Sequence, residues 1–343
     1  MRKFAAAIAL ALVVAACGGD TESEAATTAP TTTQAVATTA APPSTTEATT
    51  ATTTEPPATT APPVASSFPV TVAHGTGEVT IAERPEAIVS LSATATEILF
   101  ALGAGNQVAA VDSQSNFPAD APITGLTAYN PSVEAIAALD PDMVVMSFDP
   151  GDIESGLTAL GIPVIVQFSA LSLDDVYTQV LQLGAATDHA AAAGELVGDI
   201  QDAIAELRED LGGRDEPLTY YHELDDTLYS VTSSTFVGEL YSVVGLTSIA
   251  DPADAEGFGF PQLSPEFILE ADPDLIFLAD TKCCGQSAVT VGDRPGWDQL
   301  TAVQEGAVFE LDDDVASRWG PRVVTFLEDI VTAIEKYEAN RTD

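Results

Sequence analysis

The chain has 343 residues, enough for two domains, and 52 acidic against 11 basic side chains give it a formal net charge of -41. This charge disfavours nucleic acid and anionic membrane surfaces as partners, while the hydrophobic fraction of 46% is that of a globular protein. The chain opens with a short basic start, Met1-Arg2-Lys3. The apolar run that follows, Phe4–Val14, has the length of a signal-peptide core and is too short to span a bilayer.

The apolar run ends at Val14-Ala15-Ala16-Cys17, which resembles the lipobox of bacterial lipoproteins. The resemblance implies a signal peptide over residues 1–16, a lipid on Cys17 and an anchor on the extracytoplasmic face of the cell membrane. The alternative is an ordinary signal peptide with a chance cysteine. Residues 17–67 are almost entirely Thr, Ala and Pro, so they cannot form a core, and we expect a disordered tether.

The globular part begins near Phe68, with a predicted hairpin around His74-Gly75-Thr76-Gly77. The apolar run Ala87–Leu91 predicts a strand, and a helix follows it. We expect Thr94 and Glu97 to form a capping box at the start of that helix. Strand, tight turn and helix open a parallel α/β domain, in which ligands bind at the carboxyl ends of the strands. Ser92 and Thr94 are therefore candidate ligand contacts.

One pattern occurs twice: SVEAIAALDPDMVVMS from Ser132 and SPEFILEADPDLIFLA from Ser264. Each copy predicts a helix capped by the serine, with Glu134 or Glu266 in its first turn. Asp-Pro-Asp ends the helix, and a continuous apolar strand follows, as in a parallel sheet covered on both faces. The alternative is a generic helix-to-strand unit.

Between the two copies, residues 187–212 predict one long amphipathic helix, capped by Thr187 or Asp188 and stopped by Gly212-Gly213. It divides the chain into an N-terminal lobe, residues 68–186, and a C-terminal lobe, residues 213–343. In the second lobe, Thr227–Thr232 predicts a strand, and Ser234 or Thr235 begins a helix.

The run RPEAIVSLSATATEILFALGAGNQVAAVD resembles the opening of the iron–siderophore and cobalamin class of ABC-importer substrate-binding proteins. YNPSVEAIAALDPDMVV and GFPQLSPEFILEADPDLIFLAD resemble later landmarks of that class. The resemblance implies an α/β fold of two lobes, each a mainly parallel sheet with flanking helices, joined by one long rigid helix. It also implies a ligand held between the lobes, no catalysis and no cofactor of the protein's own.

Aromatic side chains at strand ends and in loops suit a large, mostly apolar ligand, although core burial is an equal alternative for each. With Ser92 and Thr94, the candidate ligand-binding residues are Tyr129, Phe148, Phe168, Tyr221, Phe236, Phe258, Lys282, Arg318 and Trp319. Few basic residues face the predicted cleft, which favours a corrinoid or a near-neutral hydroxamate complex over a triply anionic catecholate. For Arg318 the alternative is an ion pair with Asp312, Asp313 or Asp314.

The three histidines, His74, His189 and His222, are scattered, so no bare metal site is expected. Cys283 and Cys284 are adjacent. They form a strained vicinal disulfide, remain free thiols, or provide one ligand to a bound metal.

The leading prediction is a monomeric lipoprotein that captures a chelated-metal nutrient, a cobalamin-type corrinoid or ferric siderophore, and delivers it to the permease of an ABC importer. In the family that the chain resembles, one surface Glu on each lobe docks onto permease arginines, and Glu134 and Glu266 occupy the matching positions. The alternative for both is a helix N-terminal charge. Alternative functions are a chelatase-like enzyme that uses His222-Glu223, and a surface sensor or adhesin.

Overall fold

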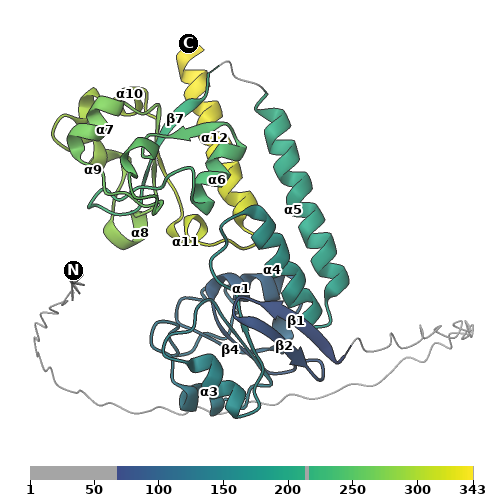
Figure 1. Ribbon diagram of the computed structural model, residues 1–343. Helices are drawn as coiled ribbons and strands as arrows, with labels where there is room; N and C mark the ends of the chain where they lie inside the picture. Colours follow the sequence, from purple (N-terminus) through teal and green to yellow (C-terminus); the bar gives the residue numbers. More distant parts are fainter. Residues whose placement is uncertain (1–67, 213–215, 343) are drawn as a thin grey trace, which may run out of the picture. The chain divides into compact units, whose positions relative to one another are not determined.

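The computed structural model describes residues 68–212 and 216–342, so the predicted signal peptide, Cys17 and the tether lie outside the described residues. The described residues fall within one compact unit and form two lobes (Figure 1). Each lobe is built on a four-stranded sheet in which all strands are parallel. The predicted α/β class is confirmed.

The N-terminal lobe holds an antiparallel hairpin and the sheet β4-β3-β5-β6. Its elements are β1 (Val70–His74), β2 (Gly77–Ile81), β3 (Ile88–Leu91), α1 (Ala93–Ala101), η1 (Gly105–Gln107), β4 (Val108–Val111), α2 (Val133–Ala137), β5 (Met143–Met146), α3 (Ile153–Ala159) and β6 (Val164–Val166). Two long helices follow, α4 (Leu173–Ala186) and α5 (Ala190–Asp210).

The C-terminal lobe holds the sheet β10-β9-β7-β8. Its elements are β7 (Leu218–Glu223), α6 (Phe236–Val243), β8 (Leu246–Ser248), η2 (Asp251–Ala253), α7 (Pro265–Ala271), β9 (Leu275–Leu278), α8 (Thr281–Cys284), α9 (Ala288–Gly292), η3 (Trp297–Gln299), α10 (Thr301–Gln304), β10 (Val308–Glu310), α11 (Asp313–Ala316) and α12 (Val323–Thr342).

The repeated sequence occupies the same place in both lobes, as α2 and β5 in one and α7 and β9 in the other. β5 lies between β3 and β6, and β9 lies between β7 and β10, so the two sheets have matching strand orders. The predicted caps are confirmed, since Ser132 accepts from the Ala135 N–H and Ser264 from the Phe267 N–H. The repeat therefore marks one structural unit used twice.

The two aspartates of the Asp-Pro-Asp motif have different structural roles. The first aspartate of each copy, Asp140 or Asp272, turns the chain at a positive φ of 52° or 43°. The second aspartate holds the start of the neighbouring strand, because Asp142 accepts from the Glu86 and Ala87 N–H groups. Asp274 does the same in the other lobe.

The N-terminal sheet is covered on both faces, as the continuous apolar strand of the repeat predicts. Alternate residues of β5 enter two different clusters. Met143 and Val145 pack with α1 residues such as Ile98, whereas Val144 and Met146 pack with Ile136 of α2. The strand is buried at all four positions because each face has its own layer of helices.

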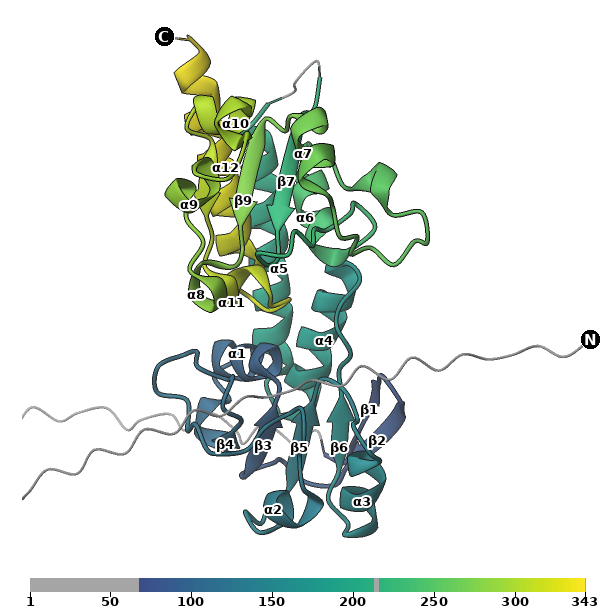
Figure 2. The same ribbon diagram turned by 90° about the vertical axis from the view of Figure 1, so that its left-hand side faces the viewer.

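Two antiparallel helices, rather than one, contact both cores, and both views show them side by side (Figures 1 and 2). In α4, Val176 packs into the C-terminal core and Leu183 into the N-terminal core. In α5, Ile204 and Ala193 make the matching contacts. The amphipathic pattern of α4 predicts a buried face but does not tell which core covers it.

Three local predictions are wrong. Neither Thr187 nor Asp188 caps α5, since Thr187 ends α4 and its hydroxyl donates to the Leu183 carbonyl. Thr94 and Glu97 form no capping box, because α1 begins one residue after Ser92, whose side chain accepts from the Ala95 N–H. Thr227–Thr232 is not a strand, because Leu228 has a φ of 69°.

Candidate functional site

Side chains that follow three neighbouring strands of the N-terminal sheet face residues of the C-terminal lobe across a small cavity. Ser92 follows β3, Asp112 follows β4 and Phe148 follows β5, as expected for the carboxyl ends of parallel strands. The segment after α11 closes the other side with Arg318 and Trp319. The cavity has a volume of about 240 Å³.

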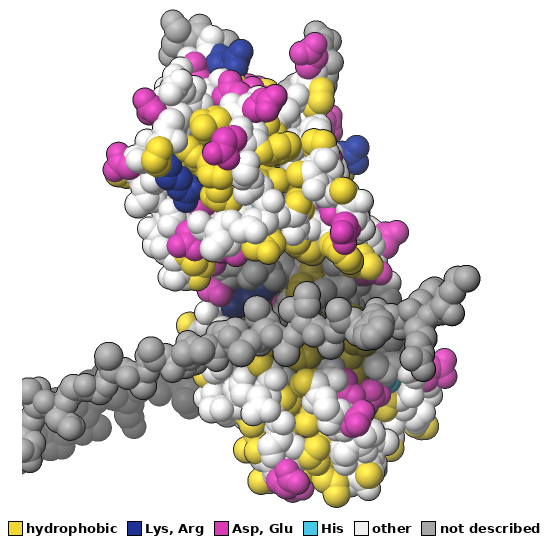
Figure 3. Space-filling model, turned by 60° about the vertical axis from the view of Figure 1, so that its left-hand side comes forward, with side chains coloured by type: hydrophobic (Ala, Val, Ile, Leu, Met, Phe, Trp, Pro, Cys, Tyr) yellow, Lys and Arg dark blue, Asp and Glu magenta, His cyan; other side chains and the backbone are white. Residues whose placement is uncertain are grey.

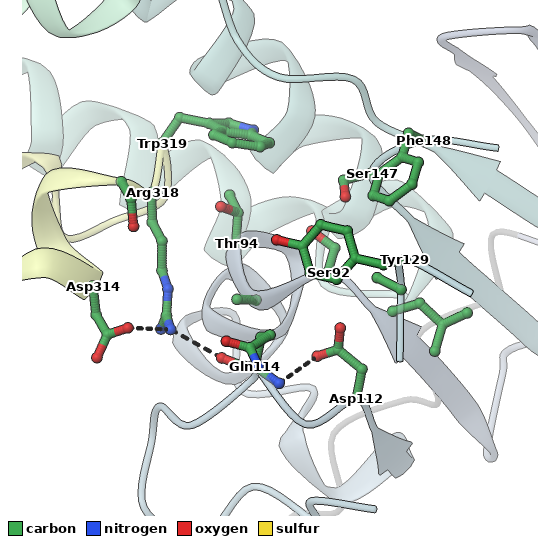
Figure 4. Close-up of a pocket in the computed structure, with 14 residues that line it drawn as sticks. Ser92, Thr94, Asp112, Gln114, Tyr129, Ser147, Phe148, Asp314, Arg318 and Trp319 are labelled. Carbon is green, nitrogen blue, oxygen red and sulfur yellow. Dashed lines mark hydrogen bonds and ion pairs between the residues drawn. The ribbon is translucent and has the colours of Figure 1, made fainter. Parts of the chain in front are cut away.

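The small cavity brings together six of the predicted ligand-binding residues (Figure 4). They are Ser92, Thr94, Tyr129, Phe148, Arg318 and Trp319. Tyr129 and Phe148 pair with their ring centroids 6.0 Å apart, and Figure 4 shows the Tyr129 hydroxyl directed towards the middle of the cavity. The Tyr129 side chain is exposed, so this aromatic wall is open to a ligand.

A larger cavity of about 780 Å³ adjoins the small one and shares Ser317, Arg318 and Trp319 with it. Its walls are mainly apolar and include the predicted Phe236 and Phe258. The Trp319 Nε1–H donates to Gln179 Oε1 at 3.0 Å, which fixes the indole that lies at both cavities. The combined volume of the two cavities is in the range of pockets that bind bulky small molecules.

Leu171 and Phe260 also line the larger cavity, and Leu171 is not among the predicted contacts. Leu171 belongs to the segment between β6 and α4, which reaches the C-terminal lobe only because α4 begins there. Like Phe258, both side chains are exposed in spite of their apolar character. Exposed apolar side chains around a cavity are typical of a ligand-binding surface.

Phe168 lies outside both cavities. It is partly exposed and packs on Gly75 of the hairpin, where a Cβ on the glycine would approach the ring to 2.6 Å. The structure therefore assigns Phe168 a packing role rather than the predicted place in the ligand-binding wall. A strand-end position brings a side chain to the correct edge of the sheet but does not set its direction.

Tyr221 is wrong as a predicted contact, because its side chain is fully buried in the C-terminal core. It packs edge-on against Trp297 and donates to Glu223 Oε2 at 3.2 Å. Burial, together with the neighbouring Glu223 carboxylate, raises the pKa of the Tyr221 phenol well above its usual range. Residues in a central strand alternate between faces, and Tyr221 points away from the cleft.

Lys282 does not line either cavity. Its side chain is half exposed and pairs with Asp312 and Asp314, and hydrogen bonds to these carboxylates raise the pKa of the ammonium group. The predicted contact with a ligand is therefore replaced by a surface ion pair with the acidic start of α11.

Arg318 lies at both cavities, as predicted, but its guanidinium is already engaged. Nη1 donates to Glu97 Oε1 at 2.8 Å, and Nη2 donates to Asp314 Oδ1 at 2.9 Å. Nη2 also donates to the Gln114 carbonyl and to Asn116 Oδ1. The ion pair with Asp314 is the alternative that the sequence left open, and it leaves Arg318 little capacity for an anionic ligand.

Glu97 joins the two lobes. Its buried carboxylate on α1 accepts from Arg318 and, at 2.6 and 2.9 Å, from Arg322 at the start of the last helix. We call Glu97, Arg318 and Arg322 the interlobe clasp. No local signal in the sequence marks Glu97 for this role, because its partners lie more than two hundred residues later.

Acidic side chains are scattered over the molecular face in Figure 3, with basic ones in few places.

The C-terminal lobe contains a second buried acidic group, in addition to Glu97. Arg294 donates to both oxygens of Glu223 at 2.6 Å, and Asp280 is fully buried nearby. Burial and the Glu223 carboxylate raise the pKa of Asp280 to about 7.

Cys283 and Cys284 are free thiols with their Sγ atoms 2.6 Å apart, beyond the length of an S–S bond. Cys283 lines the larger cavity. A hydrogen bond with Cys284, with burial second, raises the pKa of the Cys283 thiol to about 12, which disfavours a thiolate. The disulfide stays a prediction.

Among residues 68–212 and 216–342, no group of three or more His, Cys, Asp or Glu side chains could hold a metal ion. His222 is buried beside Tyr241, whose hydroxyl lies 2.8 Å from Nδ1, and burial lowers the pKa of His222 to about 3. The same described residues contain no helix that is long and apolar enough to cross a membrane.

A model of the periplasmic binding protein family matches residues 88–315, and the chain belongs to that family. The ABC transporter substrate-binding lipoprotein YvrC of Bacillus subtilis, described as uncharacterized, is 30% identical over 278 residues, 78% of this chain and 86% of that protein. A cobalamin-binding protein of Halobacterium salinarum is 27% identical over 273 residues, 76% of this chain and 72% of that protein.

Among solved structures, the periplasmic heme-binding protein RhuT of Roseiflexus sp. RS-1 in its apo form has a TM-score of 0.64 and 26% identity. The match covers 75% of this chain and 99% of that chain. The likeness supports the two-lobed fold described above. Membership of the family implies a small-molecule ligand and an ABC permease as partner.

Proposed function

We propose that this protein is the extracytoplasmic substrate-binding lipoprotein of an ABC importer and that its ligand is a corrinoid of the cobalamin type. The observation that carries the ligand class is the charge state of the cleft. Two adjoining cavities open between the lobes, the larger one with mainly apolar walls, and the basic residues beside them, Arg318 and Lys282, are paired with carboxylates.

A ligand with several anionic groups would have to displace these ion pairs in a chain of strong negative charge. A catecholate complex or a porphyrin with free carboxylates is therefore a poorer fit than a near-neutral complex. Corrinoids and ferric hydroxamates both meet this condition. The cobalamin-binding relative favours the corrinoid.

A chelatase-like enzyme is the weaker candidate. His222 and Glu223 would have to handle a metal in the cleft, yet both are fully buried. Arg294 holds both oxygens of Glu223, and Tyr241 lies against His222. The pair therefore offers no open coordination position to a ligand between the lobes.

A thermal-shift and calorimetric panel tests the ligand class, with cyanocobalamin, haem, a ferric hydroxamate and a ferric catecholate as probes. We expect saturable binding of cyanocobalamin and weaker or no binding of haem and the catecholate. Tight binding of the hydroxamate alone would move the proposal to that class. Tight binding of the catecholate would overturn the argument from charge.

Delivery to the permease is proposed to use Glu134 and Glu266. Both are exposed in the first turn of equivalent helices, α2 and α7. Glu134 accepts from the Ser132 hydroxyl at 2.9 Å, and its own backbone N–H and this hydroxyl lower its pKa, so it is charged at neutral pH. This local bond also fits the alternative, a simple helix N-terminal charge.

Replacing Glu134 and Glu266 together by Ala is expected to abolish uptake of labelled ligand while the ligand affinity of the purified protein stays unchanged. Glu86→Ala with Glu270→Ala is the matched control, because these glutamates are also exposed, one on each lobe. Lost affinity would place Glu134 or Glu266 in the ligand site. Uptake at the level of the control would show that both glutamates are only helix N-terminal charges.

A further inference from the structure

Asp112 presents an unused carboxylate oxygen to the small cavity. It follows β4 directly and is only 1% exposed, yet it is one of the cavity's lining residues. Its backbone N–H donates to the Ser90 carbonyl, which ties it to the adjacent strand β3. A buried carboxylate in such a place needs a hydrogen-bond partner for each oxygen.

One oxygen has its partners. Asp112 Oδ1 accepts from the Ser115 hydroxyl at 2.7 Å and from the Ser115 and Gln114 N–H groups at 3.0 and 3.3 Å. These three bonds fix the plane of the carboxylate. Oδ2 accepts no hydrogen bond from the described residues, and Figure 4 shows it turned towards Tyr129 and the cavity.

The charge around Oδ2 is not cancelled locally. Asp112 and Asp314 both line the small cavity, and the cation there is Arg318. That guanidinium already serves Glu97 as well as Asp314. Asp112 Oδ2 is therefore a negatively charged hydrogen-bond acceptor in the cavity that has no donor among the described residues. Its charge repels a second carboxylate.

We propose that Asp112 Oδ2 is a specificity-determining acceptor for a peripheral N–H donor of the ligand. This inference rests on the proposed corrinoid function, and the primary amides around a corrin ring supply such donors. The same oxygen rejects a ligand that presents a carboxylate at this point, as a porphyrin propionate would. Asp112 thus discriminates between a corrin and a porphyrin, two macrocycles of similar size, by the chemistry of their peripheral side chains.

Asp112→Asn is the informative substitution. The new Oδ1 is expected to keep the bonds from Ser115 and Gln114, which turns the amide NH₂ towards the cavity. An acceptor is exchanged for a donor with little change of shape. Asp112→Ser is a second variant that leaves no group at the position of Oδ2, and Asp120→Asn, exposed on the same loop, is the control.

The probes are cyanocobalamin and the purified monocarboxylates in which one peripheral amide is hydrolysed, each titrated by calorimetry. The wild type and Asp120→Asn are expected to bind cyanocobalamin about 10- to 100-fold more tightly than at least one monocarboxylate. Asp112→Asn is expected to reverse that preference, and Asp112→Ser to abolish it.

A role confined to the loop would lower the thermal midpoint of the Asp112 variants and weaken all the corrinoids equally, which would overturn this inference. An unchanged ratio of affinities in Asp112→Asn would overturn it while leaving the corrinoid function intact. Failure of the wild type to bind cyanocobalamin at all would overturn both.

Discussion

Four basic residues beside the cleft and in the lobes are paired with carboxylates, and this limits the charged groups that a ligand can contact. Arg318 and Arg322 share Glu97, Arg294 holds Glu223, and Lys282 pairs with Asp312 and Asp314. Each pairing neutralises a cation in a chain that has few of them. A ligand in the cleft therefore meets hydrogen-bonding groups and aromatic faces rather than free positive charge.

Asp280 gives a prediction at this scale. It is fully buried, neither of its oxygens accepts a hydrogen bond from the described residues, and its pKa is raised from 3.8 to about 7. The folded protein then binds a proton that the unfolded chain releases above about pH 4. The proton on Asp280 therefore stabilises the folded protein at low pH. This stabilisation is lost as the pH rises to about 7, at up to about 1.4 kcal/mol per pH unit.

Asp280→Asn cannot titrate, so its free energy of unfolding should rise relative to the wild type between about pH 5 and about pH 8. Urea denaturation at both values measures this difference. Asp226→Asn, an exposed aspartate in the same lobe, is the control and should show no such change. A constant difference between Asp280→Asn and the wild type across this range would contradict the assignment.

At the scale of elements, the repeated unit explains how a short helix and a strand are fixed in each sheet. Asp142 and Asp274 reach sideways to the first residues of the neighbouring strand, and Asp274 also accepts from the Tyr337 hydroxyl of α12 at 2.8 Å. The motif thus sets the stagger between two strands as well as ending a helix.

Replacing Asp274 by Ala should lower the free energy of unfolding by about 2–4 kcal/mol, because partly buried donors of Thr219 and Tyr337 lose a charged acceptor. Asp142→Ala should cost less, about 1–3 kcal/mol, since it leaves two backbone N–H groups nearer to solvent. Urea denaturation measures both. Asp298→Ala, exposed in the second lobe, is the control, and wild-type stability in Asp274→Ala would refute the lateral role.

At the scale of the whole described molecule, the two lobes are held by helices and by charge. α4 and α5 contact both cores, and the interlobe clasp adds a buried carboxylate between two guanidinium groups. The clasp lies beside the cavities, since Arg318 lines both of them. The spacing of the lobes and the shape of the cleft are therefore set by the same contacts.

Glu97→Gln removes the charge that compensates Arg318 and Arg322. Because Arg322 loses its carboxylate partner and the largely buried Arg318 keeps only Asp314, the expected loss is about 3–5 kcal/mol of stability. Small-angle X-ray scattering should also show a larger radius of gyration as the lobes separate. Glu78→Gln, an exposed glutamate of the same lobe, should change neither quantity. A stable variant with the wild-type radius would show that the helices alone hold the lobes.

Local patterns in the chain were enough to find most of the fold. The repeat with its serine caps and the apolar strands depend on residues a few positions apart, and each lies where the sequence predicts it. Ser92 and Phe148 meet at one cavity because strand ends of a parallel sheet share an edge, whereas Arg318 and Trp319 reach it from the segment after α11. Asp112 also follows a strand, so the same rule could have found it.

The remaining features depend on contacts between distant parts of the chain. Glu97 belongs to the clasp rather than to a capping box because Arg318 and Arg322, 221 and 225 residues away, reach it in the folded state. Tyr221 packs in the C-terminal core and Lys282 pairs with Asp312 because residues distant in the sequence surround them in the folded state. Hydrophobic spacing and capping act over one or two turns and can be read from the sequence, whereas the partner of a charge is fixed only when the lobes pack together.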